Sequence, residues 1–205
     1  MTLYELFIKR LFDILFSFVG LVILIPVYVV VSVLIKMDGK GSVLFYQKRI
    51  GKNLKPFTLY KFRSMVTGSS TMGLSITIDD DLRITKIGSI LRKTKIDEIP
   101  QLYNVLKGDM SLVGPRPEVS KYVEMFYNDY KHILKVRPGI TDLASILYRD
   151  EASILGKFSD PEKEYVNKIL PDKIFLAREY IKNMSFTVDL SIVIKTLLSL
   201  FKHIT

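Results

Sequence analysis

The feature that most constrains this chain is an apolar segment near its N-terminus, because no charged residue occurs from Ile14 to Ile35. A helix of that length spans about 33 Å, and the hydrocarbon core of a bilayer is about 30 Å thick. The segment exceeds a signal-peptide core, and no small-residue cleavage site follows it. A core helix that is apolar on every face is also improbable in a protein of 205 residues. The segment therefore predicts an integral membrane protein.

Pro26 lies in the middle of this segment and predicts a kinked helix, because proline removes a backbone hydrogen bond and clashes with the preceding turn. Positively charged flanks tend to stay on the cytoplasmic side. They occur here on both sides of the segment, at Lys9, Arg10, Lys36, Lys40, Lys48, Arg49 and Lys52. We therefore favour a re-entrant helix, which returns to the face it entered, over a kinked span. On this interpretation residues 1–36 form the re-entrant membrane helix, and residues 37–205 form a cytoplasmic domain packed on the membrane interface.

The composition restricts the chemistry that the chain can perform. It has no cysteine, which excludes disulfides, thiolate nucleophiles and cysteine-based metal sites. His132 and His203 are the only imidazole bases. The formal net charge of +9 implies an anionic partner. The basic residues are scattered rather than gathered in one run, so we expect membrane lipids and phosphorylated substrates, and no nucleic acid.

The remainder of the chain predicts a mainly helical α+β domain that begins with a small β-hairpin. Two β-prone runs, Val43–Tyr46 and Phe57–Phe62, flank a Gly-Lys-Asn turn. Residues 66–81 are rich in Ser, Thr, Gly and Asp, and we expect a mobile loop there.

Four segments that follow show helical signals. Apolar residues recur at helical spacing from Ile96 to Leu106 and from Glu118 to Leu134. Asp160 before Pro161 is a typical helix start, and Pro171 predicts the opening of the next helix.

The last segment, Val188 to Ile204, is apolar except for a narrow polar stripe of Ser191, Lys195, Ser199 and Lys202. Beside a membrane anchor, such a helix is typical of an amphipathic helix in the membrane interface. The alternative is a C-terminal helix that packs on the core.

Asp97 and Glu98 are the first candidate catalytic residues. They precede Pro100, which is tolerated only in the first turn of a helix, so both carboxylates lie near a helix N-terminus. There the helix dipole favours anions, and cations at Arg92, Lys93 and Lys95 are close in sequence. This setting suits a carboxylate nucleophile that attacks phosphorus. On position alone, an ordinary N-cap and first-turn acid are the favoured alternative.

Two further motifs offer binding groups. Gly114-Pro115-Arg116-Pro117 is a rigid turn that fixes the direction of one guanidinium, which suits phosphate recognition. Its alternative is a helix-entry turn with a solvated arginine. The run Asp79–Asp81 could hold a divalent ion against a nucleotide diphosphate, as in a metal-dependent glycosyltransferase, although an acidic loop is favoured there.

Five segments, in this order and spacing, resemble one protein family over nearly the whole chain. They are KRLFDILFS (residues 9–17), YQKRIGKN (46–53), YKFRSM (60–65), DLRITKIGSILRKTKIDEIPQLYNVLKGDMSLVGPRPE (81–118) and VRPGITDLASI (136–146). The family is the bacterial sugar transferases, the small monotopic phosphoglycosyl transferases. The resemblance reverses the preference on Asp97, Glu98 and Arg116.

The resemblance implies transfer of a sugar phosphate from a UDP-sugar to a polyprenyl phosphate such as undecaprenyl phosphate, with release of UMP. The reaction takes place at the cytoplasmic face of the bacterial inner membrane. Asp97 would attack the β-phosphate and form a covalent intermediate, Glu98 would assist it, and Mg²⁺ at Asp97 would neutralise the diphosphate. Arg92 and Arg116 match family arginines that face phosphates, and Arg149 corresponds by spacing to a third.

Two departures from the family pattern affect these expectations. Ile25 replaces the serine that commonly precedes the family's helix-breaking proline, so the kink here must depend on Pro26. Asp142 stands where many members have glycine, and Arg149 follows Leu147-Tyr148 instead of Asn-Gly. The chain shows none of the extra N-terminal helices of larger members, so we expect a minimal catalytic unit. The competing hypothesis is a non-catalytic membrane scaffold of a polysaccharide-assembly complex.

Overall fold

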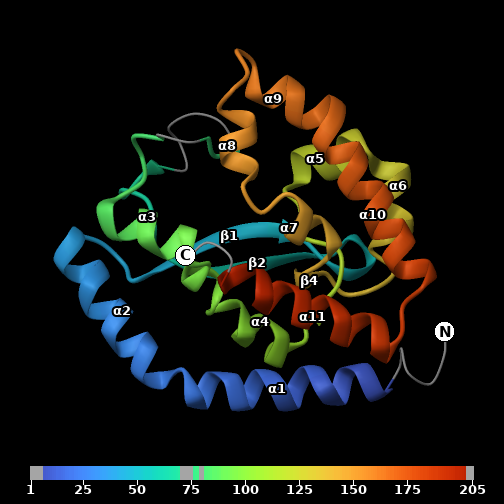
Figure 1. The fold of residues 1–205 in the computed structure, drawn as a ribbon, viewed down its shortest axis with the longest axis horizontal. Coiled ribbons are helices and arrows are strands. Elements are labelled where there is room, and N and C mark those ends of the chain that lie inside the picture. The colour runs from blue at the N-terminus through green and yellow to red at the C-terminus, as the bar shows by residue number, and fades with distance from the viewer. Residues whose placement is uncertain (1–6, 70–75, 79–80, 202–205) are drawn as a thin grey trace.

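A computed structural model describes residues 7–69, 76–78 and 81–201 (Figure 1). The fold is mainly helical with two small sheets, as expected for the α+β class. Its strands are β1 Leu44–Ile50, β2 Pro56–Phe62, β3 Ser111–Val113 and β4 Gly139–Thr141. Its α-helices are α1 Lys9–Ile23, α2 Ile25–Asp38, α3 Lys86–Lys93, α4 Gln101–Lys107, α5 Ser120–Met125, α6 Tyr127–Ile133, α7 Leu143–Leu147, α8 Glu151–Leu155, α9 Pro161–Glu164, α10 Leu170–Lys182 and α11 Phe186–Phe201.

The N-terminal helices α1 and α2 are joined by a sharp bend. Their axes differ by 60° across Leu24, and Pro26 is the second residue of α2. No single helix in the described part of the chain is long and apolar enough to cross a membrane, whereas this bent pair could do so by length and composition. Figure 1 shows both arms running along one side of the rest of the molecule.

Helix α1 is apolar in overall composition, but the face that packs on the domain makes polar contacts. The Arg10 guanidinium donates to the carbonyl oxygens of Val105 and Leu106 at 2.7 and 3.0 Å, and so caps the end of α4. The buried Asp13 carboxylate accepts from the Ser111 hydroxyl and the Leu112 N–H at 3.0 and 2.9 Å. These bonds tie α1 to α4 and β3.

The second arm, α2, is held by apolar packing and by one arginine. Val31 and Ile35 pack with Phe62 and Leu91 in one buried cluster. The Arg63 guanidinium donates to the Ile35 carbonyl at 3.0 Å, at the C-terminal end of α2. Both arms of the bent pair therefore pack on the same domain.

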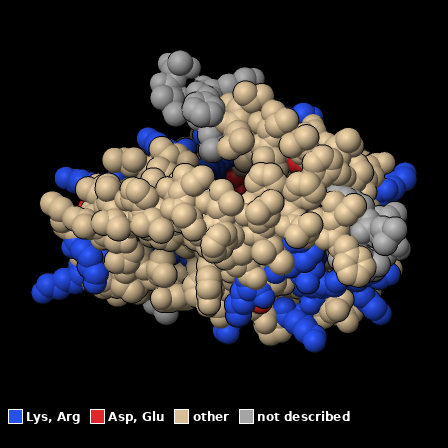
Figure 2. Space-filling model, turned by 90° about the horizontal axis from the view of Figure 1, so that it is seen from below, with Lys and Arg blue, Asp and Glu red and all other residues tan. Residues whose placement is uncertain are grey.

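The outer faces of these helices are apolar and exposed. Figure 2 views the molecule from this side and shows a broad band without charge, with Lys and Arg at its margins. Exposed side chains on α1 and α2 include Leu11, Leu15, Phe18, Val22, Val29 and Val33. The outer face of α11 adds Leu190, Ile194, Leu197 and Leu198.

Helix α11 packs one face on the core and leaves its other face exposed. Ile192 is buried against Val113 and Tyr180, so the helix packs on the core. Asp189, near its start, pairs with Lys9 of α1 and accepts from the Tyr180 hydroxyl at 2.6 Å. On its other side Leu190, Ile194, Leu197 and Leu198 remain exposed, together with Ser191 and Lys195.

The predicted β-hairpin is confirmed. β1 and β2 pair antiparallel from Leu44↔Phe62 to Ile50↔Pro56, so the first strand extends beyond the predicted Tyr46. A turn, η2 Lys52–Leu54, connects them. Asn104 of α4 fixes the hairpin, since its side chain accepts from the Tyr60 N–H at 3.1 Å and donates to the Thr58 carbonyl at 2.7 Å.

One helix prediction needs correction. The single helix over 118–134 is wrong, because the backbone leaves helical geometry at Phe126 (φ −118°, ψ 40°) and separates α5 from α6. The break lets both helices turn residues into the main core cluster, including Tyr122 on α5 and Ile133 on α6. The Asp160 cap is confirmed by a 3.0 Å bond from the Lys163 N–H. Pro171 is the second residue of α10, as predicted, and a π-helical turn, η5 Tyr165–Ile169, joins α9 to α10.

Gly88 packs α3 directly onto the segment that follows the hairpin. A Cβ atom built on Gly88 lies 2.0 Å from the Ser64 carbonyl oxygen. We expect Gly88→Ala to lower stability by roughly 3 kcal/mol through overpacking, seen as a melting temperature lowered by about 6–12 °C in detergent. The matched control is Gly39→Ala, since a Cβ there meets nothing within 4 Å. An unchanged melting temperature for Gly88→Ala would contradict the close approach of α3.

Candidate active site

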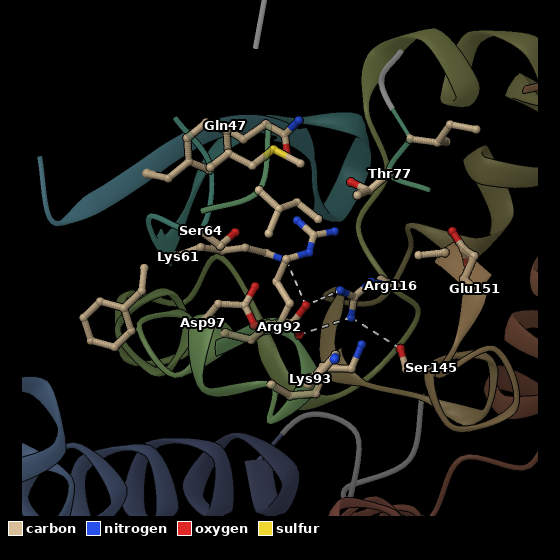
Figure 3. Close-up of a pocket in the computed structure, with 18 of the residues that line it drawn as sticks. Gln47, Lys61, Ser64, Thr77, Arg92, Lys93, Asp97, Arg116, Ser145 and Glu151 are labelled. Atoms are coloured by element: carbon tan, nitrogen blue, oxygen red, sulfur yellow. Dashed lines mark hydrogen bonds and ion pairs between the residues drawn. The ribbon is translucent and has the colours of Figure 1, made fainter. Parts of the chain in front are cut away.

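A cleft of about 1250 Å³ lies between the hairpin, α3 and the α7–α8 region. Ten Lys and Arg residues and five Asp and Glu residues line it among the residues that the structure describes. Figure 3 shows side chains from separate elements converging in this cleft, among them Lys61, Arg92, Asp97 and Arg116. An anionic ligand would therefore be stabilised by the field of the cleft.

Asp97 lies at the bottom of this cleft, in the short 3-10 turn η4 Ile96–Glu98 that precedes α4. Its side chain is buried, with 5% of the residue exposed, and its Oδ1 has no hydrogen-bond partner in the described structure. Burial raises the pKa of Asp97, and the positive charge of Lys61 opposes this. A buried acceptor atom without a partner is costly unless something binds there.

The neighbouring carboxylate has the opposite environment. The Lys61 ammonium donates to Glu98 Oε1 at 2.8 Å, and the Arg116 guanidinium donates to both Glu98 oxygens. Burial on its own would raise the pKa of Glu98, but the charges of Arg116 and Lys61 outweigh it and hold that pKa well below its usual range. Both oxygens of Glu98 therefore have cationic partners, whereas Asp97 Oδ1 has none in the described structure.

The proline-flanked turn fixes Arg116 as expected, but it directs the guanidinium to Glu98. The Arg116 N–H donates to Asp142 Oδ2 at 3.0 Å. Asp142 also caps α7 by accepting from the Ser145 N–H, so one carboxylate aligns the turn and the helix. The Arg116 side chain still lines the cleft, where Ser145 Oγ lies 3.4 Å from its Nη1.

The other predicted arginines also line the cleft. Arg92 lies in the last turn of α3. Arg149 lies between α7 and α8, and its Nη2 donates to the Lys93 carbonyl at 3.4 Å. The five predicted site residues come from three distant parts of the sequence, and all of them line the cleft: Arg92, Asp97, Glu98, Arg116 and Arg149.

Sequence reasoning named Lys95 among the cations near Asp97 but assigned no role to Lys61, and the structure places both lysines in the same cleft. Lys61 was present within the YKFRSM segment. Only the pairing of β2 with η4 reveals its partner, which lies 37 residues away.

The carboxylate at Asp97 would suit Mg²⁺ that is also held by substrate and water. It would not suit a metal ion that needs a full set of protein ligands. No group of three or more His, Asp or Glu residues that could hold a metal ion occurs within the described ranges. Mg²⁺ is commonly held by one or two carboxylates together with substrate phosphates and water. The Asp97 carboxylate supplies an oxygen donor of this kind in the cleft.

The remaining sequence candidates lie elsewhere or are engaged. Asp79 and Asp80 lie outside the described residues, and Asp81 is paired with Arg83, which lowers the pKa of Asp81. His132 is exposed on α6, and His203 also lies outside the described residues.

Comparison with known proteins decides the family. The sequence profile of the bacterial sugar transferases matches residues 4–203 of this chain. The chain belongs to the bacterial sugar transferase family. The match includes every residue of the cleft described above.

Curated relatives of this family member include three of stated activity or pathway. The UDP-N-acetylgalactosamine-undecaprenyl-phosphate N-acetylgalactosaminephosphotransferase of Aeromonas hydrophila is 40% identical over 93% of this chain and 43% of its own length. The exopolysaccharide production protein PSS of Rhizobium leguminosarum bv. phaseoli is 39% identical over 95% of this chain and 96% of its own length. The undecaprenyl-phosphate galactose phosphotransferase of Salmonella typhimurium is 34% identical over 93% and 40%. The chain spans less than half the length of the first and third relatives.

The pairing of Glu98 predicts a measurable effect on stability. Glu98→Ala removes the carboxylate that pairs with both Lys61 and Arg116. We expect a loss of about 2 kcal/mol, below the roughly 3–5 kcal/mol of a fully buried pair, because the Lys61 and Arg116 side chains keep 19% and 31% exposure. Thermal unfolding in detergent measures it. Asp129→Ala, which breaks the more exposed pair with Arg178, is the control and should cost under about 1 kcal/mol. Equal losses for the two variants would show that the pairing of Glu98 contributes no more stability than an exposed ion pair.

Proposed function

We propose that this chain transfers a sugar 1-phosphate from a UDP-sugar to polyprenyl phosphate, through a covalent intermediate on Asp97, and releases UMP. The observation that carries the proposal is Asp97 itself, a buried carboxylate with an unpartnered oxygen in a cationic cleft. The names of two relatives, both undecaprenyl-phosphate sugar phosphotransferases, support the reaction class.

In the first step, Asp97 Oδ1 attacks the β-phosphorus of the UDP-sugar. The new bond joins Oδ1 to phosphorus, and the bond from that phosphorus to the oxygen bridging the two phosphates breaks. UMP leaves with the bridging oxygen and its electron pair. The ordinary obstacle is repulsion between two anions, which the cations around Asp97 reduce.

In the second step, a phosphate oxygen of polyprenyl phosphate attacks the same phosphorus. A diphosphate bond forms, the bond to Asp97 breaks, and the carboxylate is restored. The covalent intermediate allows a water-soluble donor and a lipid acceptor to react in turn in one cleft.

The residues around Asp97 divide the remaining tasks. Glu98 is held ionised by Lys61 and Arg116, so we assign it to positioning these cations rather than to proton transfer. Arg92, Arg116 and Arg149 would contact the donor phosphates. Asp97 would also hold Mg²⁺, which neutralises charge on the diphosphate when bound.

The bent helix pair supports a position at the cytoplasmic face of the bacterial inner membrane. Both arms pack on the same domain, through Arg10 and Asp13 on α1 and through Val31 and Ile35 on α2. Their outer faces and that of α11 form one exposed apolar surface. A re-entrant helix fits this arrangement, and it would put the cleft beside the lipid acceptor.

The covalent mechanism predicts an exchange reaction without a lipid acceptor. Purified protein with Mg²⁺ should incorporate labelled UMP into its UDP-sugar, because the first step is reversible. Asp97→Asn should lower this exchange by at least about 10³-fold, since an amide is a poor nucleophile. Chelation of the metal should suppress exchange in the unchanged protein.

The matched control is Asp129→Asn on α6, which does not line the cleft and should exchange normally. Normal exchange by Asp97→Asn would remove Asp97 as the nucleophile. Release of UDP instead of UMP would favour a metal-dependent glycosyltransferase. Full cellular function of Asp97→Asn would favour a membrane scaffold.

The re-entrant helix predicts that both flanks of the apolar segment lie in the cytoplasm. The absence of cysteine allows single-cysteine variants at Thr2, Gly39 and, as a domain control, Lys157. A membrane-impermeant maleimide should label none of them in intact spheroplasts and all of them after permeabilisation. Labelling of Thr2→Cys alone in intact spheroplasts would instead establish a kinked span.

A further inference from the structure

Two hydrogen bonds join the segment of Lys93 and Lys95 to Arg149 across the cleft. The Lys95 ammonium donates to the Arg149 carbonyl at 3.3 Å, and Arg149 Nη2 donates to the Lys93 carbonyl at 3.4 Å. The two segments are 54 residues apart in sequence. Arg149 Nη1 is buried and has no hydrogen-bond partner in the described structure. The contact therefore leaves one guanidinium donor available within the cleft.

The backbone of Lys95 is in the left-handed region, with φ 57° and ψ 15°. It follows Thr94 at the end of α3, where helices commonly place glycine because a Cβ atom is unfavourable there. Asn53 and Leu54 are the other described non-glycine residues with positive φ, and both belong to the hairpin turn. Lys95 is thus the only strained residue of this kind that the described structure shows in the cleft.

The side chain of Lys95 is half-buried and lines the cleft together with Asp97 and Glu98. Strained residues persist where the surrounding structure requires them, and they cluster at functional sites.

We infer that Lys95 is a positioning residue that acts through Arg149. Its ammonium holds the Arg149 backbone so that the free Nη1 donor is directed to the diphosphate of the donor substrate. The left-handed backbone serves this role by turning the Lys95 side chain toward the Arg149 segment, from a position two residues before Asp97. This inference rests on the proposed function, and it explains why a lysine occupies a position that suits glycine.

The decisive variant is Lys95→Gly, because it removes the contact and relieves the backbone strain together. We expect its melting temperature to be no lower than that of the unchanged protein. We expect its KM for the UDP-sugar in UMP exchange to rise about tenfold, as for loss of a hydrogen bond from a charged donor. A purely structural residue would not combine retained stability with weakened donor binding.

A double-mutant cycle with Arg149→Ala tests whether the two residues act together. Lys95→Gly in combination with Arg149→Ala should raise KM no further than Arg149→Ala does, because residues that act through one another are non-additive. Lys95→Arg, which keeps a long cationic donor, should restore most of the donor affinity. Asn53→Gly relieves similar backbone strain at an exposed turn and is the matched control, with KM unchanged.

Three outcomes would overturn the inference. They are an unchanged KM for Lys95→Gly, multiplicative losses in the double variant, and failure of Lys95→Arg to restore donor affinity. Failure of the proposed function is distinguishable, because the unchanged protein would then show no UMP exchange at all, and the inference would fall with it.

Discussion

The organisation of the cleft depends on how one buried carboxylate, Glu98, is neutralised. Burying an ion costs free energy unless opposite charges accompany it. Glu98 meets this requirement with Lys61 from β2 and Arg116 from the turn after β3. The three charged groups can pair with one another only when the hairpin, η4 and that turn lie close together. The ion pair thus fixes the relative position of three elements and sets the charge around Asp97.

Two adjacent carboxylates consequently have different chemistry. Glu98 is surrounded by cations, and its pKa is held well below the usual range, whereas burial raises the pKa of Asp97. Sites that use two carboxylates commonly separate their roles in this way. Glu98 takes up the charge of Lys61 and Arg116, so Asp97 is left with an oxygen that no protein group occupies. The unpartnered atom is the one suited to bond formation.

The sequence predicted what local patterns encode. The hairpin, the helix start at Asp160 and the location of Asp97 near a helix start follow from turn residues and from periodicity. The sequence could not predict the break at Phe126, which depends on burial of residues on both sides in one cluster. It also could not assign Lys61, because the partner is set by strand placement and not by spacing. The resemblance supplied roles for Asp97 and the arginines, but not the engagement of Arg116 by Glu98.

The apolar segment also shows what sequence alone could not predict. Its composition suggests a helix that is surrounded by lipid on all sides. Arg10 and Asp13 nevertheless bind α4 and β3. A helix that left the domain to cross a bilayer upright would lose these bonds and carry a buried carboxylate into hydrocarbon, which is expensive. Keeping the bonds requires α1 to lie along the domain with only its outer face in lipid. The same polar contacts that fold α1 onto the domain therefore favour the shallow, bent anchor proposed above.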